Sequence, residues 1–134
     1  MTISPFEIQV RFADIDMMGH VNNSVYLSYF EMTRVHYLEK LLGRKWDYTR
    51  EGFLLARNEI DYIKPLFLHE EPKIFLRTEN LGTKSFTFTY EILVDGELRT
   101  KGLSVMVAFD SQSQTTIAIP EKMREAFLLL KKEQ

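Results

Sequence analysis

The hydrophobic pattern of this chain predicts an α+β fold, in which a curled antiparallel sheet wraps around one long central helix. Residues 23–42 are apolar on most faces of a helix, which is typical of a helix that other elements enclose. After residue 52, apolar and polar residues alternate with a period of two, and this favours antiparallel strands. With 134 residues, the chain is expected to form a single domain over 1–134.

The first predicted elements are a strand over Glu7–Phe12, where residues alternate, and the long helix that follows. Apolar positions at steps of three and four place one stripe along this helix, and Gly43 is a suitable C-terminal stop. The stripe consists of Tyr26, Phe30, Thr33, Tyr37 and Leu41.

The second half of the chain predicts four further strands and a terminal helix. The strands are expected over Phe53–Lys64, Lys73–Asn80, Ser85–Val94 and Leu98–Phe109, with turns at Gly82-Thr83 and Asp95-Gly96 and a helix opened by Pro120. A single sheet of this kind leaves two edges unpaired, so we expect a homodimer or a dimer of dimers.

Composition excludes several classes of function. The chain has no cysteine, and therefore no disulfide, thiol nucleophile or cysteine metal site. A net charge of −2 argues against a nucleic-acid partner. No apolar run approaches the ~20 residues of a membrane span, and the N-terminus does not have the pattern of a signal peptide. We therefore expect a cytoplasmic protein without a membrane span.

The segment between the first strand and the helix concentrates groups suited to chemistry. It contains Asp14, Asp16, Gly19, His20, Asn22 and Asn23 within ten residues. A helix that starts beside a carboxylate offers backbone N–H donors and a partial positive charge next to a potential base or nucleophile. That combination is what a site stabilising an oxyanion requires.

The residues from Phe12 to Arg34, FADIDMMGHVNNSVYLSYFEMTR, resemble the opening motif of hotdog-fold acyl-CoA thioesterases of the 4-hydroxybenzoyl-CoA thioesterase-like group. The segments Glu59–Leu66, Thr83–Phe86 and Val105–Asp110 also resemble that family. The resemblance implies a hotdog fold and hydrolysis of an acyl-CoA to free acid and CoA, in the shared groove of a homodimer. An acyl carrier protein thioester is an alternative substrate, and no metal or cofactor is implied beyond the CoA of the substrate.

The resemblance also implies roles for individual residues. Asp16 acts as nucleophile or general base, and the backbone N–H of Asn23 polarises the thioester carbonyl. The alternative for Asp16 is helix capping. Gly19 provides positive φ or close approach of the backbone to the substrate.

Two neighbouring residues are open to more than one interpretation. An imidazole is suited to proton transfer near neutral pH, but the functional His of some family members lies seven residues after the aspartate, where this chain has Asn23. His20 is therefore either catalytic or a residue that fixes the loop. Asp14 is expected to accept hydrogen bonds that brace the loop, and a metal site combining the two aspartates with His20 is the weaker alternative.

Candidate substrate-binding residues come from three segments. At the helix start they are Asn22, with helix capping as its alternative, and Tyr26, which together with Tyr29 and Phe30 lines either an acyl pocket or the core. The hairpin tip adds Thr83, Lys84 and Ser85. The basic candidates for the CoA phosphates are Arg57, Lys64, Lys84, Arg99 and Lys101.

Two functions other than hydrolysis fit the same fold. A non-catalytic module binding acyl-CoA or acyl carrier protein would gain nothing from Asp16 near a carbonyl. An enoyl hydratase or dehydratase usually pairs a His with a carboxylate, and His20 is not at the family position. Thiol release from acyl-CoAs and product analysis with an enoyl-CoA would discriminate between them.

Overall fold

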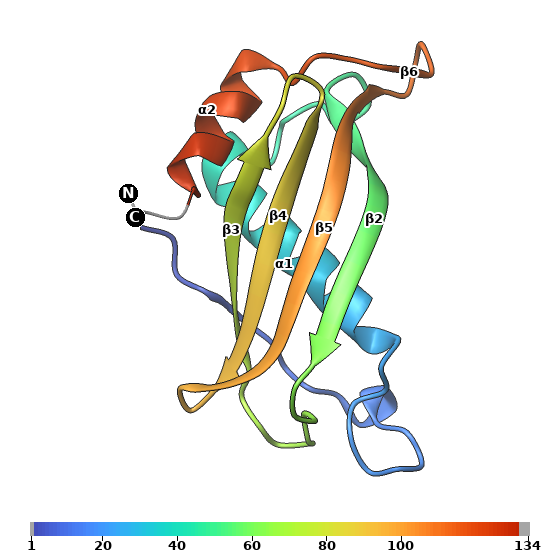
Figure 1. Cartoon of the computed structure of the whole chain (residues 1–134), viewed down its shortest axis with the longest axis vertical. Helices are drawn as coiled ribbons and strands as arrows, with labels where there is room; N and C mark the ends of the chain where they lie inside the picture. Colours follow the sequence, from blue (N-terminus) through green and yellow to red (C-terminus); the bar gives the residue numbers. More distant parts are fainter. Residues whose placement is uncertain (1, 132–134) are drawn as a thin grey trace.

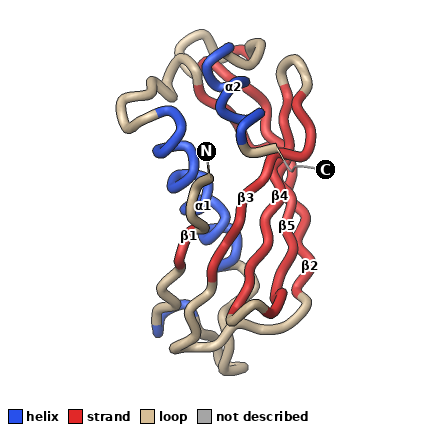
Figure 2. The backbone as a smooth tube through the Cα atoms, turned by 90° about the vertical axis from the view of Figure 1, so that its left-hand side faces the viewer, coloured by secondary structure: helices blue, strands red, loops and turns tan. Residues whose placement is uncertain are grey.

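The computed structural model describes residues 2–131 and shows one long helix lying across the concave face of a curled antiparallel sheet (Figures 1 and 2). The predicted hotdog architecture is confirmed. The strand order is β1-β3-β4-β5-β2, so that β2 is an edge, and a short β6 pairs with β5. The elements are β1 (Phe6–Glu7), α1 (Val25–Leu42), β2 (Gly52–Tyr62), β3 (Lys73–Leu81), β4 (Ser85–Val94), β5 (Glu97–Asp110), β6 (Thr115–Thr116) and α2 (Glu121–Leu129).

The prediction for the first strand was wrong, whereas α1 and the four long strands lie within two residues of their predicted bounds. The first strand pairs with β3 only over Phe6–Glu7, and Phe12–Asp14 forms a turn of 3₁₀ helix. The carboxylate of Asp14 accepts hydrogen bonds from the main chain and side chain of Arg11. These local bonds replace the ladder bonds of a strand.

The two hairpins of the sheet have the expected turns. Val94 pairs with Glu97, and between them Asp95 and Gly96 both have positive φ, at 49° and 79°. Two central residues with positive φ match the twist of antiparallel strands. At the other hairpin, the N–H of Gly82 donates to the carbonyl of Ser85 at 2.8 Å.

The core lies between α1 and the sheet. The rings of Phe30 and Tyr90 stack with centroids 4.1 Å apart, and Gly102 of β5 lies directly beneath the Phe30 ring. The apolar sequence of the helix predicted that other elements would enclose it, but within this chain the helix is not enclosed on all sides. Its outer side exposes Leu27 and Val35 by 43% and 56%, because this chain's sheet covers only one side of α1.

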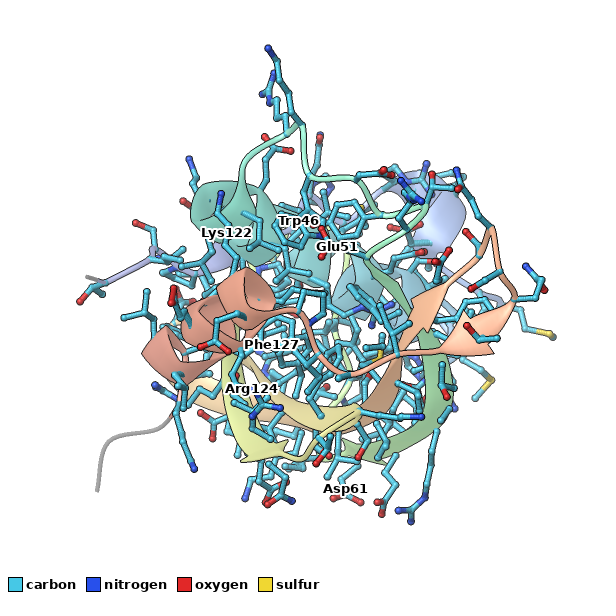
Figure 3. The ribbon with its side chains drawn as sticks, turned by 90° about the horizontal axis from the view of Figure 1, so that it is seen from above. Trp46, Glu51, Asp61, Lys122, Arg124 and Phe127 are labelled. Carbon is cyan, nitrogen blue, oxygen red and sulfur yellow. The ribbon has the colours of Figure 1, made fainter. Side chains whose placement is uncertain are left out.

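The terminal helix closes one end of the molecule (Figure 3). Phe127 packs against Phe86 with ring centroids 4.5 Å apart, and Arg124 donates to the carbonyl of Gly82. Lys122 lies 5.8 Å from the ring of Trp46, in the segment after α1. These contacts hold α2 over the turn between β3 and β4. In the part of the chain that the structure describes, no helix has the length and apolar character needed to cross a bilayer.

Candidate active site

The loop before α1 is a small hairpin closed by a bridge between Ile15 and Val21. The N–H of Gly19 donates to the carbonyl of Asp16 at 3.0 Å, and the N–H of Asp16 donates to the carbonyl of His20 at 3.1 Å. Gly19 has φ of +88°, which only glycine adopts without strain. The positive φ expected at Gly19 is therefore what turns the chain.

Both carboxylate oxygens of Asp16 accept hydrogen bonds from this loop. The backbone N–H of Met18 donates to Oδ1 at 2.9 Å, and the side-chain amide of Asn22 donates to Oδ2 at 3.2 Å. The Asp16 side chain is half-buried. Donated hydrogen bonds fix the orientation of the carboxylate, and each oxygen keeps a further lone pair for a substrate or a water.

Asn22 connects this carboxylate to the start of the helix. Its Oδ1 accepts from the backbone N–H of Ser24 at 2.9 Å and from the Ser24 hydroxyl at 2.7 Å. The Asn22 side chain thus holds Ser24, the residue before α1, while its amide holds Asp16. In this geometry Asn22 is a positioning residue rather than a direct contact for the substrate.

The next residue presents a backbone donor at the positive end of α1. Within residues 2–131, the N–H of Asn23 has no protein acceptor in hydrogen-bonding range. The carbonyl of Asn23 accepts from the hydroxyl of Tyr62 at 3.1 Å, which orients the following peptide unit, between Asn23 and Ser24. Sequence reasoning missed Tyr62, because its contact with residue 23 depends on how β2 ends beside the loop. A free N–H at the start of a helix is suited to stabilise a developing oxyanion.

Asp14 braces the loop, as expected. It is 2% exposed and accepts hydrogen bonds from Arg11 and, at 2.8 Å, from the Tyr29 hydroxyl. Burial acts to raise the pKa of Asp14, but the donated hydrogen bonds outweigh it and hold the pKa below the usual value. Burial and the adjacent Asp14 carboxylate raise the pKa of the Tyr29 phenol well above its ordinary range, so Tyr29 remains a proton donor.

The imidazole of His20 contacts Val21 and Phe67. Its Nδ1 lies 3.4 Å from the carbonyl of Val21, and its ring meets the edge of Phe67 with centroids 6.2 Å apart. Among the described residues, no hydrogen bond joins the imidazole of His20 to the carboxylate of Asp16. These contacts favour the loop-fixing interpretation. Residues 2–131 also contain no cluster of three His or acidic side chains that could hold a metal ion.

The aromatic residues expected near the acyl group belong to the core. Tyr26, Tyr29 and Phe30 are at most 2% exposed. Tyr26 packs edge-on against Tyr62 with centroids 4.9 Å apart. The structure therefore shows that these three aromatic side chains are part of the core.

The structure does not bring the hairpin-tip residues to Asp16 within one chain. Thr83, Lys84 and Ser85 lie at the end of the sheet beneath α2, whereas the Asp16 loop lies at the opposite end (Figure 1). Lys84 donates to the hydroxyl of Thr116 at 3.3 Å and has no carboxylate partner among the described residues.

Most of the other basic candidates are neutralised by acidic neighbours. Arg57 pairs with Glu59 at 2.9 Å, and Lys64 pairs with Glu97 at 2.7 Å. Arg99 is the most enclosed of the set and pairs with Glu97 and Glu70, both at 2.7 Å. Lys101 forms no ion pair within residues 2–131, and it lies on the outer face of the sheet opposite Glu91 and Asp61 (the position of Asp61 is visible in Figure 3).

Comparison with known families agrees with this geometry. Residues 10–127 match the family described as the Thioesterase-like superfamily. The chain belongs to this superfamily. By this membership it is a thioester hydrolase, and proteins named as acyl-CoA thioesterases are among its relatives.

Three similar proteins illustrate the relationship. The protein YsmA of Bacillus subtilis is 31% identical over 124 residues, covering 91% of this chain and 83% of YsmA. The long-chain acyl-CoA thioesterase FadM of Escherichia coli is 27% identical over 122 residues, covering 89% and 92% of the two chains. A Thermus thermophilus thioesterase, solved in complex with coenzyme A and Zn, is 33% identical with a TM-score of 0.84, covering 98% and 96%.

Proposed function

We propose that this thioesterase superfamily member hydrolyses acyl-CoA thioesters, with Asp16 as nucleophile or general base and the N–H of Asn23 as the oxyanion donor. One observation carries the assignment: the carboxylate of Asp16, oriented by Asn22 and Met18, lies in the loop that leads to an unused N–H at the positive end of α1. Coenzyme A is bound by the similar Thermus protein, and FadM is named for acyl-CoA substrates, which supports CoA as the carrier.

In this mechanism, the thioester carbonyl accepts a hydrogen bond from Asn23 N–H, and charge developing on its oxygen is stabilised by that donor and by the helix dipole. As general base, Asp16 takes a proton from the attacking water. As nucleophile, it forms an anhydride that water then hydrolyses. In both routes the thiolate of CoA leaves, and the acid is released.

The test is release of free thiol from a panel of acyl-CoAs by Asp16→Asn and Asp16→Ala. We expect kcat to fall by about 10²–10⁴, the usual contribution of a positioned base. Asp47→Asn is the matched control, because Asp47 makes the same local contact, accepting from the N–H two residues later at 3.0 Å. Full activity in both Asp16 variants would remove this carboxylate from the mechanism. Binding of acyl-CoA without thiol release by the wild type would favour a binding module.

The same proposal includes a homodimer formed along β2. This strand is a sheet edge and exposes Leu54 and Leu55 by 50% and 47%, so a second copy would both pair the edge and cover apolar surface. A twofold axis through two antiparallel β2 strands would bring the Thr83–Ser85 hairpin of one chain to the same end of the sheet as the partner's catalytic loop. That arrangement gives Lys84 and its neighbours access to CoA from across the interface.

Sedimentation equilibrium measures this directly. We expect twice the mass of the chain for the wild type and the monomer mass for Leu55→Arg, which places a charge on the proposed interface. A monomeric wild type at micromolar concentration would contradict the pairing.

A further inference from the structure

Residues 63–72, which join β2 to β3, lie at the same end of the sheet as the loop that carries Asp16 (Figure 1). The two loops are joined by a main-chain hydrogen bond, in which the N–H of Val21 donates to the carbonyl of Leu66 at 2.8 Å. Both residues are at most 1% exposed, so water does not compete for this bond. Val21 also forms the bridge with Ile15 that closes the small hairpin around Asp16. The position of Leu66 therefore helps to determine where this hairpin lies.

Arg99 of β5 holds the first part of the connection between β2 and β3. Residues 63–72 form neither a helix nor a strand, so other contacts must fix their conformation. The carbonyl of Arg99 accepts hydrogen bonds from the N–H groups of Ile63 and Lys64, both at 3.0 Å. Its Nη1 donates to the carbonyl of Pro65 at 2.7 Å. Three consecutive residues of the connection are thus bound to one residue of the sheet.

The guanidinium of Arg99 also holds the residues that follow. Nη1 and Nη2 donate to the two carboxylate oxygens of Glu70 at 2.9 and 2.7 Å, and Nε donates to Glu97 at 2.7 Å. The Glu70 oxygen that Nη1 contacts also accepts from the backbone N–H of Phe67 at 2.7 Å. Arg99 therefore fixes the chain on both sides of Leu66, directly before it and through Glu70 after it.

These contacts leave Arg99 little capacity to bind a phosphate, although its basic side chain makes it a candidate for the CoA phosphates. Four of the five N–H groups of its guanidinium donate to protein acceptors, and its side chain is 11% exposed. Hydrogen bonds from Arg99 hold the pKa of Glu70 below its usual value, so this carboxylate stays charged near neutral pH. A phosphate at Arg99 would meet the negative charges of Glu70 and Glu97.

We propose that Arg99 is a positioning residue for thioester hydrolysis, which locks the connection between β2 and β3 so that Leu66 holds the Asp16 hairpin in its reactive geometry. The inference rests on the proposed function and deepens it. Among the described residues, none of the hydrogen bonds of Arg99 reaches Asp16, so Arg99 acts through the main chain of Leu66 and Val21. A catalytic group displaced by about 1 Å can lose about 10²-fold in rate.

Two substrates distinguish positioning from phosphate binding. One is the acyl-CoA that the wild type hydrolyses fastest, and the other is the same acyl group on pantetheine, which lacks the phosphates of CoA. We expect kcat of Arg99→Met to fall by up to about 10²-fold on both substrates, with KM near the wild-type value. Loss of a phosphate ligand would instead raise KM for the CoA thioester alone.

Glu70→Gln gives opposite results for the two roles. An amide has one acceptor oxygen in place of two and cannot accept from both Nη1 and Nη2 of Arg99, so positioning predicts a lower kcat on both substrates. If Arg99 bound a phosphate, removal of the competing carboxylate would lower KM for the CoA thioester. Arg77→Met, at an exposed arginine of β3, is the matched control and should keep both constants.

Hydrogen exchange of the Val21 amide, followed by NMR, separates local positioning from a general loss of stability. In Arg99→Met this amide should exchange at least about tenfold faster than in the wild type, because the charged hydrogen bonds that hold its acceptor are lost. The amides of β4 should keep their wild-type rates. A merely structural defect would accelerate exchange in β4 as well and would not lower kcat of the folded enzyme.

Each result bears on a definite claim. Wild-type kcat in Arg99→Met and Glu70→Gln, a change of KM confined to the CoA thioester, or wild-type exchange of the Val21 amide would overturn the positioning role. If Arg99→Met does not fold, Glu70→Gln decides by the same criteria. Full activity of Asp16→Asn would instead contradict the proposed function, and the exchange rates would still show whether Arg99 holds the loop.

Discussion

Replacing Gly102 by alanine tests how closely α1 approaches the sheet. A Cβ at this position would overlap the ring of Phe30 and would come within 3.3 Å of Tyr90. Phe30 is fully buried and stacked on Tyr90 at 8° between ring planes, so it has no free volume into which to move. The extra methyl group must therefore displace the helix or force both rings from their packing.

The size of the effect follows from two opposing contributions. Overpacking a close-packed core costs about 1–3 kcal/mol. Loss of glycine's freedom in the unfolded chain offsets about 0.4–1 kcal/mol of that cost. The midpoints of these two ranges leave a fall in the free energy of unfolding of about 1.3 kcal/mol, and we expect the melting temperature to fall by about 3–5 °C for each kcal/mol in a chain of this length.

Urea denaturation of the variant and the wild type is the assay, with the m-value serving as a check that the unfolded state is unchanged. Gly82→Ala is the matched control, because its Cβ would meet only Ser85 in an exposed turn, at 3.2 Å or more. The control should change stability by no more than about 0.5 kcal/mol. Combining Gly102→Ala with Phe30→Leu should cost less than the sum of the two single changes. Wild-type stability in Gly102→Ala would refute the close approach of helix and sheet.

Two further predictions concern the loop and its chemistry. Asp14→Asn should lower the free energy of unfolding at pH 7 by about 1–3 kcal/mol, because buried hydrogen bonds from Arg11 and Tyr29 lose their charged acceptor. The folded-state pKa of Asp14 lies below the unfolded value of about 3.9, so its contribution is complete above that pH and is lost as the pH falls through the folded-state pKa. Urea curves of wild type and variant should therefore converge in this acidic window, and a constant gap between them would contradict the linkage. Dialysis against a chelator should leave thiol release unchanged, since Asp16 and the Asn23 amide supply the proposed chemistry, whereas activity lost on dialysis and restored by zinc would contradict it.

The elements that sequence reasoning located correctly are those with strong local signals. The two-residue period of Ser85–Val94 and the Asp95-Gly96 turn predicted a hairpin whose geometry depends only on nearby residues. The prediction of the first strand failed because a competing local interaction is not visible in the hydrophobic pattern. Asp14 offers its neighbours side-chain hydrogen bonds that compete with strand pairing, and an alternating pattern does not reveal that competition.

Some parts of the candidate site could likewise be predicted from the sequence, whereas others could not. The sequence located the loop, Asp16 and the start of α1, because these are adjacent in the chain. It did not reveal that Asn22 bridges Asp16 to Ser24, just before the helix, nor that Tyr62, thirty-nine residues after Asn23, donates to the Asn23 carbonyl. Those contacts depend on side-chain directions and on where β2 ends, and neither can be read from spacing.

By itself, the sequence determined that a long apolar helix would pack on an antiparallel sheet and that a carboxylate would stand near the start of that helix. Hydrophobic periodicity and turn chemistry are local, and they act before any distant residue is in contact. Only the tertiary structure decided that Arg34, Tyr90, Ser104 and Asn58 form one chain of hydrogen bonds. These residues lie on α1, β4, β5 and β2, and their contact is set by the register of three strands and the height of one helix above them.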